Sequence, residues 1–99
     1  MTKQENTFWQ NELERYRQLL LHPLWLQRRN AILQRDSYRC RNCGATSQLQ
    51  VHHRQYHVYR HNNFRKEPWA YADHLLITLC RSCHENGHRR HVVPVFKVD

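Results

Sequence analysis

The sequence has no long apolar run. The longest apolar stretch, from Leu19 to Leu26, is interrupted by His22 and Pro23, so it is far too short to cross a membrane. The chain opens with the polar segment MTKQENTFWQ rather than an apolar signal segment, and it contains no repeats and no low-complexity segments. These absences argue against a membrane-spanning protein, and they predict one cytoplasmic domain within the 99 residues.

Acidic residues are also scarce. The chain has 16 Lys and Arg against 8 Asp and Glu, which gives a net charge of +8. Residues 1–23 hold three of each sign, so the whole excess lies in residues 24–99, together with the cysteines and eight of the nine histidines. A basic surface attracts polyanions, and nucleic acid is the commonest polyanion in a cell. A solvated basic face without any partner has the same composition.

Two helices are predicted before the first cysteine. Over residues 4–21 the large apolar side chains recur at helical spacing, at Trp9, Leu13, Tyr16 and Leu20. Pro23 ends this helix and can open a second one over residues 24–35, because proline suits the first turn of a helix. The first helix is expected to pack on the domain as residues 1–23, followed by the main body at residues 24–99.

The remainder predicts short strands and one further helix. Residues 49–53 alternate as in a strand, and residues 75–79 form an apolar run typical of a second strand. Residues 54–74 are polar, aromatic and basic, and they are interpreted mainly as loop. A turn and a helix are expected over residues 80–88, and a short edge strand over residues 91–96. The fold class predicted is a small α+β domain.

The four cysteines form two matched pairs. Cys40-x2-Cys43 and Cys80-x2-Cys83 are separated by 36 residues. Each pair can present two sulfurs to one ion, and the two pairs together complete a tetrahedral zinc site without an open position, which is typical of a structural site. Redox-active or buried thiol pairs are the alternatives, but paired cysteines in the cytosol more often bind metal. Apolar residues make up only 39% of the chain, and a core this small usually needs such a staple.

The histidines indicate a second metal site. His84 and His88 are four residues apart, so on a helix they share a face and can grip one ion. His52 and His53 end the first predicted strand, where neighbours point to opposite faces, and both reach one site only if the strand bends or ends there.

A metalloprotease pattern is also present. The run His84-Glu85-Asn86-Gly87-His88 matches H-E-x-x-H, in which two histidines bind zinc and the glutamate is the general base. The chain is short and basic, the run abuts a cysteine pair, and Gly87 weakens the helix by about 1 kcal/mol relative to alanine. The protease interpretation is therefore the weaker one.

The order of these motifs resembles the HNH endonuclease family. The resemblance covers roughly residues 24–91. It is carried by Cys40-x2-Cys43-Gly44, by Leu49-x-Val51-His52-His53, and by Leu75-Leu-Ile-Thr-Leu-Cys80-x2-Cys83-His84-x3-His88. The resemblance implies a ββα-metal finger (His-Me finger), in which a hairpin and a helix surround one catalytic divalent ion. It further implies a four-cysteine structural zinc beside that ion, with the two predicted helices preceding this core.

The resemblance also implies roles for single residues. His53 matches the general base, and His52, His84 and His88 match the ligands of the catalytic ion. The family's middle asparagine aligns with Leu75, and Asp73 or His74 would have to take its place. An imidazole ligand set suits Zn, Ni, Co or Mn, whereas Mg prefers oxygen, so the metal stays open.

The function implied is a metal-dependent endonuclease that hydrolyses DNA, double-stranded by expectation, and leaves 5′-phosphate and 3′-hydroxyl ends. Such a protein would be cytoplasmic, of bacterial or phage-encoded type, and its oligomeric state stays open. Three alternatives are a non-catalytic zinc-stapled nucleic-acid-binding module, the protease, and an interaction protein that uses residues 4–21. The residues expected to contact phosphates are Arg28, Arg29, Arg54, Arg81 and Arg89.

Overall fold

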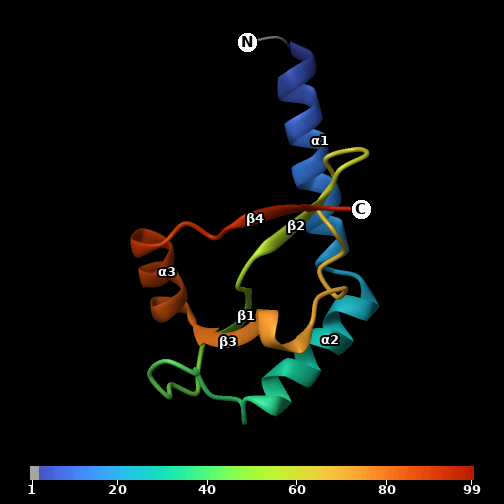
Figure 1. Cartoon of the computed structure of the whole chain (residues 1–99). Coiled ribbons are helices and arrows are strands. Elements are labelled where there is room, and N and C mark those ends of the chain that lie inside the picture. The colour runs from blue at the N-terminus through green and yellow to red at the C-terminus, as the bar shows by residue number, and fades with distance from the viewer. Residues whose placement is uncertain (1–2) are drawn as a thin grey trace.

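The computed structural model describes residues 3–99, with side chains from Phe8 onward, as a small α+β fold (Figure 1). Two N-terminal helices are followed by two small two-stranded sheets and a C-terminal helix. In chain order the elements are α1 (Lys3–Leu19), α2 (Pro23–Arg35), β1 (Leu49–His53), β2 (Tyr56–Tyr59), η1 (Asp73–Leu75), β3 (Leu76–Cys80), α3 (Arg81–Arg90) and β4 (Val95–Val98).

The junction of α1 and α2 is built by local capping. Pro23 occupies the first turn of α2, and the His22 side chain accepts a hydrogen bond from Leu24 N–H through Nδ1 at 3.0 Å. Both features suit a helix start, where backbone N–H groups lack partners within the helix. The two helices predicted over residues 4–21 and 24–35 are therefore confirmed, with ends that shift by one or two residues.

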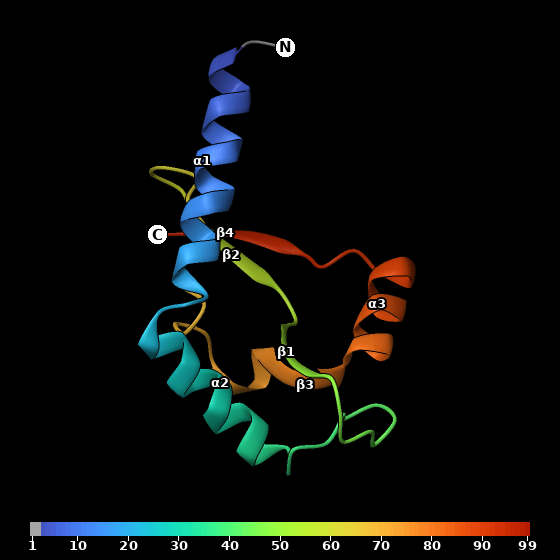
Figure 2. The same cartoon turned by 180° about the vertical axis from the view of Figure 1, so that it is seen from behind.

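Helix α1 buries only part of its predicted apolar face. Tyr16 is buried, and its ring lies 6.5 Å from that of Tyr56 and 5.2 Å from the Arg65 guanidinium. Trp9 and Leu13, in the preceding two turns, stay 64% and 47% exposed. The N-terminal end of α1 projects away from the other elements in Figures 1 and 2, although the Phe8 ring lies 6.2 Å from that of Phe64. The division of the chain at residue 23 stays a prediction.

Strands β1 and β3 form the sheet that positions the candidate site. They pair antiparallel, from Leu49 opposite Cys80 to His53 opposite Leu76. Both predicted strands are thus confirmed. Helix α2 packs on these strands, and so does α3, which begins at the residue after β3 ends. Figure 2 shows the pair lying between the two helices.

The second sheet was not predicted in full. Residues 54–74 were expected to be mainly loop, but they contain β2, which pairs in parallel with β4 from Tyr56 opposite Val95 to Tyr59 opposite Val98. The expectation was wrong for β2 because its partner lies almost forty residues further along the chain, beyond the reach of local pattern. The edge strand expected over residues 91–96 begins later, at Val95, after Pro94.

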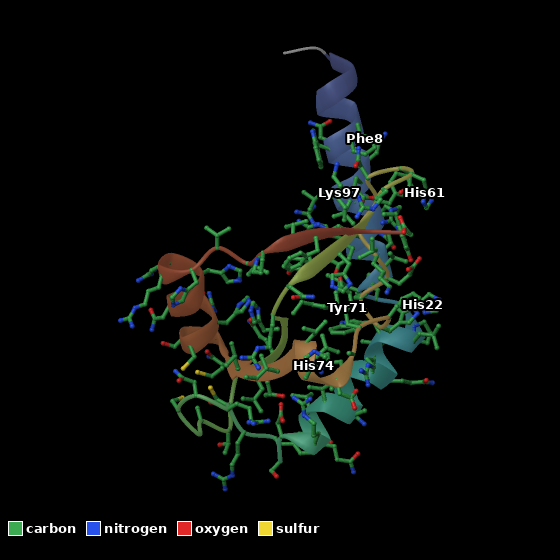
Figure 3. The ribbon with its side chains drawn as sticks, in the orientation of Figure 1. Phe8, His22, His61, Tyr71, His74 and Lys97 are labelled. Atoms are coloured by element: carbon green, nitrogen blue, oxygen red, sulfur yellow. The ribbon has the colours of Figure 1, made fainter. Side chains whose placement is uncertain are left out.

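The core lies between α2 and the β1–β3 pair. It is formed by Trp25, Ile32, Tyr71 and Leu76, and Val51 and Trp69 pack against it. Figure 3 shows Tyr71 above η1, on the side of α2. Burying these side chains stabilises the fold by about 1.5–3 kcal/mol each. Because the core is small, buried polar contacts such as those of Asp36 also matter for stability.

Asp36, the residue after α2, joins three segments through a buried carboxylate. It accepts hydrogen bonds from Thr78 N–H of β3 at 2.9 Å, from Arg35 Nε at 2.9 Å and from Arg41 Nη1 at 2.8 Å. Burial raises the pKa of the carboxyl, but the hydrogen bonds of these three donors outweigh burial and hold its pKa well below the usual range. The charged carboxylate therefore holds the end of α2, the first cysteine turn and β3 in register.

We expect Asp36→Asn to lower the free energy of unfolding by about 1–3 kcal/mol, because an amide cannot accept all three charge-assisted hydrogen bonds. Asp73→Asn is the matched control, since Asp73 is 71% exposed and pairs with Arg28 at the surface. The control should cost at most about 1 kcal/mol. Chemical denaturation at a fixed zinc concentration measures both, and equal costs would contradict the role given to Asp36.

Candidate metal centres

The four cysteines meet at the start of α3. Cys40 and Cys43 come from the loop after α2, Cys80 is the last residue of β3, and Cys83 lies in the first turn of α3. Their four sulfurs lie within 4.8 Å of one another, and all four thiols are free. Figure 3 shows the sulfur atoms gathered at the base of α3. The predicted convergence of the two pairs is confirmed.

Local backbone geometry aims the sulfurs inward. Cys43 N–H donates to Cys40 Sγ at 3.5 Å, and Cys83 N–H donates to Cys80 Sγ at 3.5 Å, so the two turns have the same design. Gly44 follows the first turn with φ +81°, a left-handed conformation that glycine adopts without strain. Burial raises the pKa of Cys40, but backbone hydrogen bonds outweigh it and lower the pKa to about 6. Cys40 therefore favours the thiolate. The hydrogen bond from Asn42 lowers the pKa of Cys83, but hydrogen bonds with the other cysteine sulfurs outweigh it and raise that pKa to about 12.

These sulfurs fit one zinc ion. Zn–S bonds of about 2.3 Å in a tetrahedron place the sulfurs about 3.8 Å apart. Cys43 Sγ and Cys80 Sγ are 3.7 Å apart, which matches this spacing and is far longer than a disulfide bond. Four cysteine ligands leave no position for a substrate. The cluster is therefore suited to a structural ion.

Three histidines form a second cluster beside the first. His52 points from β1 toward α3, where His84 and His88 lie one turn apart. The ring centroids are 4.9 Å apart for His52 and His84, 5.5 Å for His52 and His88, and 4.4 Å for His84 and His88. One nitrogen from each ring lies within 4.8 Å of the others. The structure thus brings together the three residues predicted as ligands of a second ion.

The electrostatics of this triad suit a cation. Burial, followed by the neighbouring His84 and His88, lowers the pKa of His52 to about 4. Burial and His88 also lower the pKa of His84. The imidazoles of His52 and His84 are therefore neutral near pH 7, which is the state that binds metal. Among the described residues nothing hydrogen-bonds the buried Nδ1 of His52, while Nε2 of His84 and Nε2 of His88 face each other at 2.9 Å. An ion would satisfy such nitrogens.

The triad opens onto a cavity of about 190 Å³. Three protein ligands leave at least one coordination position for water or substrate, in contrast to the closed cysteine cluster. The cavity is lined by His52, Arg54, Leu79, His84, Gly87, His88, His91, Val92, Val93 and Pro94. A larger cavity of about 690 Å³ lies between α1 and the second sheet, but among the described residues no metal-binding cluster lines it.

His53 lies on the other side of β1 from the triad. Its side chain is 5% exposed, and its ring stacks between those of Trp25, at 5.1 Å, and Tyr56, at 5.6 Å. Its Nε2–H donates to the carbonyl of Pro68 at 2.9 Å. Burial lowers the pKa of His53, so the ring is neutral. The structure therefore does not bring His53 together with the three ligands, and its role as general base stays a prediction.

The group that orients His53 was not found from the sequence. Asp73 or His74 was expected to replace the family's asparagine, but Asp73 pairs with Arg28 and His74 is exposed. A backbone carbonyl, that of Pro68, holds the His53 ring instead. Backbone carbonyls leave no signal in a sequence.

The arginines expected to contact phosphates fall into two groups. Arg28 donates to Tyr71 O at 2.8 Å, Arg29 donates to Leu49 O at 3.5 Å, and Arg81 pairs with Glu85 at 3.1 Å. The guanidinium groups of Arg54 and Arg89 make no hydrogen bond or ion pair within the part of the chain that the structure describes. The guanidinium groups of the second group have all their donors available for a ligand, whereas those of the first group already use some of theirs internally.

Comparisons of the chain with protein-family models, with curated proteins and with solved structures found no match. No helix among residues 3–99 is long and apolar enough to span a membrane. The interpretation of the site therefore rests on its own geometry.

We expect Cys43→Ser to lose one zinc ion per chain and to lower the free energy of unfolding by at least about 3 kcal/mol, because structural zinc contributes roughly 10–16 kcal/mol of binding energy to folding. Ser82→Ala, in the turn between Cys80 and Cys83, is the matched control and should keep its zinc. Metal analysis and thermal unfolding with and without chelator measure both effects. Unchanged zinc content in Cys43→Ser would contradict the assignment of a zinc site to the four cysteines.

Proposed function

We propose that this chain is a metal-dependent endonuclease of the HNH, or ββα-metal, type that hydrolyses phosphodiester bonds in DNA. The observation that carries the proposal is the convergence of His52, His84 and His88 on an open cavity, directly beside a closed four-cysteine cluster. An open three-ligand site is typical of catalytic metals, whereas a closed four-cysteine site is typical of structural ones.

The arrangement of elements supports the same proposal. The proposal is supported by the order of three elements: a β-strand that carries one of the histidines, its antiparallel partner, and a following helix that carries the other two. This order is the one expected of a ββα-metal finger. The expected products are 5′-phosphate and 3′-hydroxyl ends. Net charge of +8 favours a polyanionic substrate. DNA is the partner proposed, in its double-stranded form.

A divalent ion held by the triad would act as a Lewis acid on the scissile phosphate and would stabilise the leaving oxygen. The three imidazoles would hold that ion and would leave room in the cavity for a phosphate. They suit Zn, Ni, Co or Mn better than Mg. His53 is the proton acceptor implied by the resemblance, but the geometry supports this role least, because the ring is buried and its Nε2–H is engaged by Pro68.

The burial of His53 favours a second candidate function, a non-catalytic zinc-stapled module that binds nucleic acid. Such a module needs the cysteine cluster and the basic surface, but it needs no proton acceptor beside the triad. The protease interpretation has less support, because the Glu85 carboxylate pairs with Arg81 on the exposed surface of α3. The interaction-protein interpretation would rest on the exposed Trp9 and Leu13 of α1.

The nuclease proposal predicts metal-dependent nicking of supercoiled plasmid by protein that retains one zinc ion per chain, on addition of Mg, Mn, Ni, Co or Zn. We expect His84→Ala to slow nicking at least about 100-fold, since even the loss of a residue supporting a ligand costs about 10–100-fold. His61→Ala is the control, because His61 is exposed and lies far from α3 (Figure 3), and it should stay within about twofold of wild type.

Two further variants separate the candidates. His53→Ala tests the proton acceptor, and Glu85→Gln tests the protease, which predicts loss of peptide hydrolysis. If wild type cuts with none of the metals but still shifts DNA in a gel, the nuclease proposal fails and the nucleic-acid-binding module replaces it.

A further inference from the structure

The cavity at the histidine triad contains one permanently charged side chain. Of its ten lining residues, three are the proposed ligands, and five are apolar or glycine: Leu79, Gly87, Val92, Val93 and Pro94. The other two are His91 and Arg54. An arginine stays charged at any physiological pH, and it presents a planar fork of donors that matches phosphate oxygens. Arg54 is therefore the strongest anion-binding group in this cavity.

The backbone of Arg54 is fixed while its side chain is free. Arg54 follows the last residue of β1, and its N–H donates to Leu75 O at 2.8 Å, which closes the end of the β1–β3 pair. The side chain is exposed. Within the described residues its guanidinium has no hydrogen bond or ion pair, in contrast to Arg28 and Arg35, whose side chains bind backbone carbonyls. A fixed backbone that carries a guanidinium without a partner suits ligand binding.

The position of Arg54, directly after β1, places it next to the ligand cluster. It is two residues after His52, so the pleat of a regular strand would direct both side chains to the same face, and both line the same cavity. An anion that entered the cavity would meet this guanidinium and the ion of the triad together.

We propose that Arg54 binds the scissile phosphate beside the ion held by His52, His84 and His88, and that it stabilises the negative charge that develops on the phosphate oxygens. This inference rests on the proposed nuclease function. Arg54 would then touch the reacting group and be a catalytic residue. The free arginines outside the cavity lining, such as Arg89, would only hold the DNA backbone.

Single-turnover cleavage kinetics test this role. We expect Arg54→Ala to lower the rate constant at saturating DNA about 100–1000-fold, as loss of one transition-state donor does, while the half-saturating DNA concentration rises only about tenfold, through the lost ground-state contact to the phosphate. Arg54→Lys, which keeps the charge but loses the fork, should recover part of the rate. Arg17→Ala on α1, exposed and paired with Glu14, is the control and should cut like wild type.

Binding of dimethyl phosphate, a phosphodiester without a cleavable DNA chain, gives a second readout. Titrated into zinc-loaded protein and followed by NMR, it should bind wild type and Arg17→Ala at least about tenfold more tightly than Arg54→Ala. Arg54→Gln is a second variant, and an unchanged zinc content would show that it folds. Its affinity for dimethyl phosphate should match that of Arg54→Ala. Rate constants within threefold of wild type for Arg54→Ala would overturn the inference even though the nuclease stands. If wild type cuts nothing, the nuclease proposal fails. The inference about Arg54 is overturned as well if wild type and Arg54→Ala bind dimethyl phosphate equally tightly.

Discussion

The candidate site depends on one short segment, the junction of β3 and α3. Cys80 ends the strand, and Cys83 and His84 follow as neighbours in the first turn of the helix. Because one of these neighbours belongs to the cysteine cluster and the other to the histidine triad, neither cluster can move without the other. An ion bound by the four sulfurs would fix where α3 begins and in which direction it runs. His88 follows one turn later, so its position is set by the same constraint.

The strand β1 divides a pair of histidines between two layers. Alternation along a strand sends His52 toward α3, where it meets the triad, and His53 toward α2, where it meets Trp25 and the core. The two adjacent residues, which look like one functional unit in the sequence, therefore lie in two different environments. One ring lies at the open cavity, and the other is enclosed by aromatic rings and held by a carbonyl. In a chain with so small an apolar core, the buried His53 also contributes to packing.

Much of this architecture followed from local pattern. The spacing of the cysteines, and that of His84 and His88, indicated which of these side chains would converge, because the period of a helix and the geometry of a CxxC turn are both short-range. The choice of His52 as the third histidine came from the resemblance. Helix starts and ends were predictable for the same reason, through Pro23 at α2. The alternation of β1 also predicted that His52 and His53 would part unless the strand bent or ended there; the pairing with β3 runs through His53, and the two side chains do part.

What could not be predicted depends on contacts between distant segments. The parallel pairing of β2 with β4 joins residues almost forty positions apart. Likewise, the sequence could not separate Arg28, which binds the carbonyl of Tyr71, from Arg54, which has no such partner in the described part of the chain. Nor could the sequence show that the carboxylate of Asp36 binds the backbone of β3. Each case needs the positions of backbone groups that only the folded chain brings together.

Anomalous X-ray scattering at the zinc absorption edge, from crystals grown with excess zinc, tests the central claim most directly. The account predicts two peaks per chain, one among the sulfurs of Cys40, Cys43, Cys80 and Cys83, and one among the rings of His52, His84 and His88. A single peak at the cysteines, with the triad empty at saturating zinc, would contradict a metal centre at the histidines and, with it, the proposed chemistry.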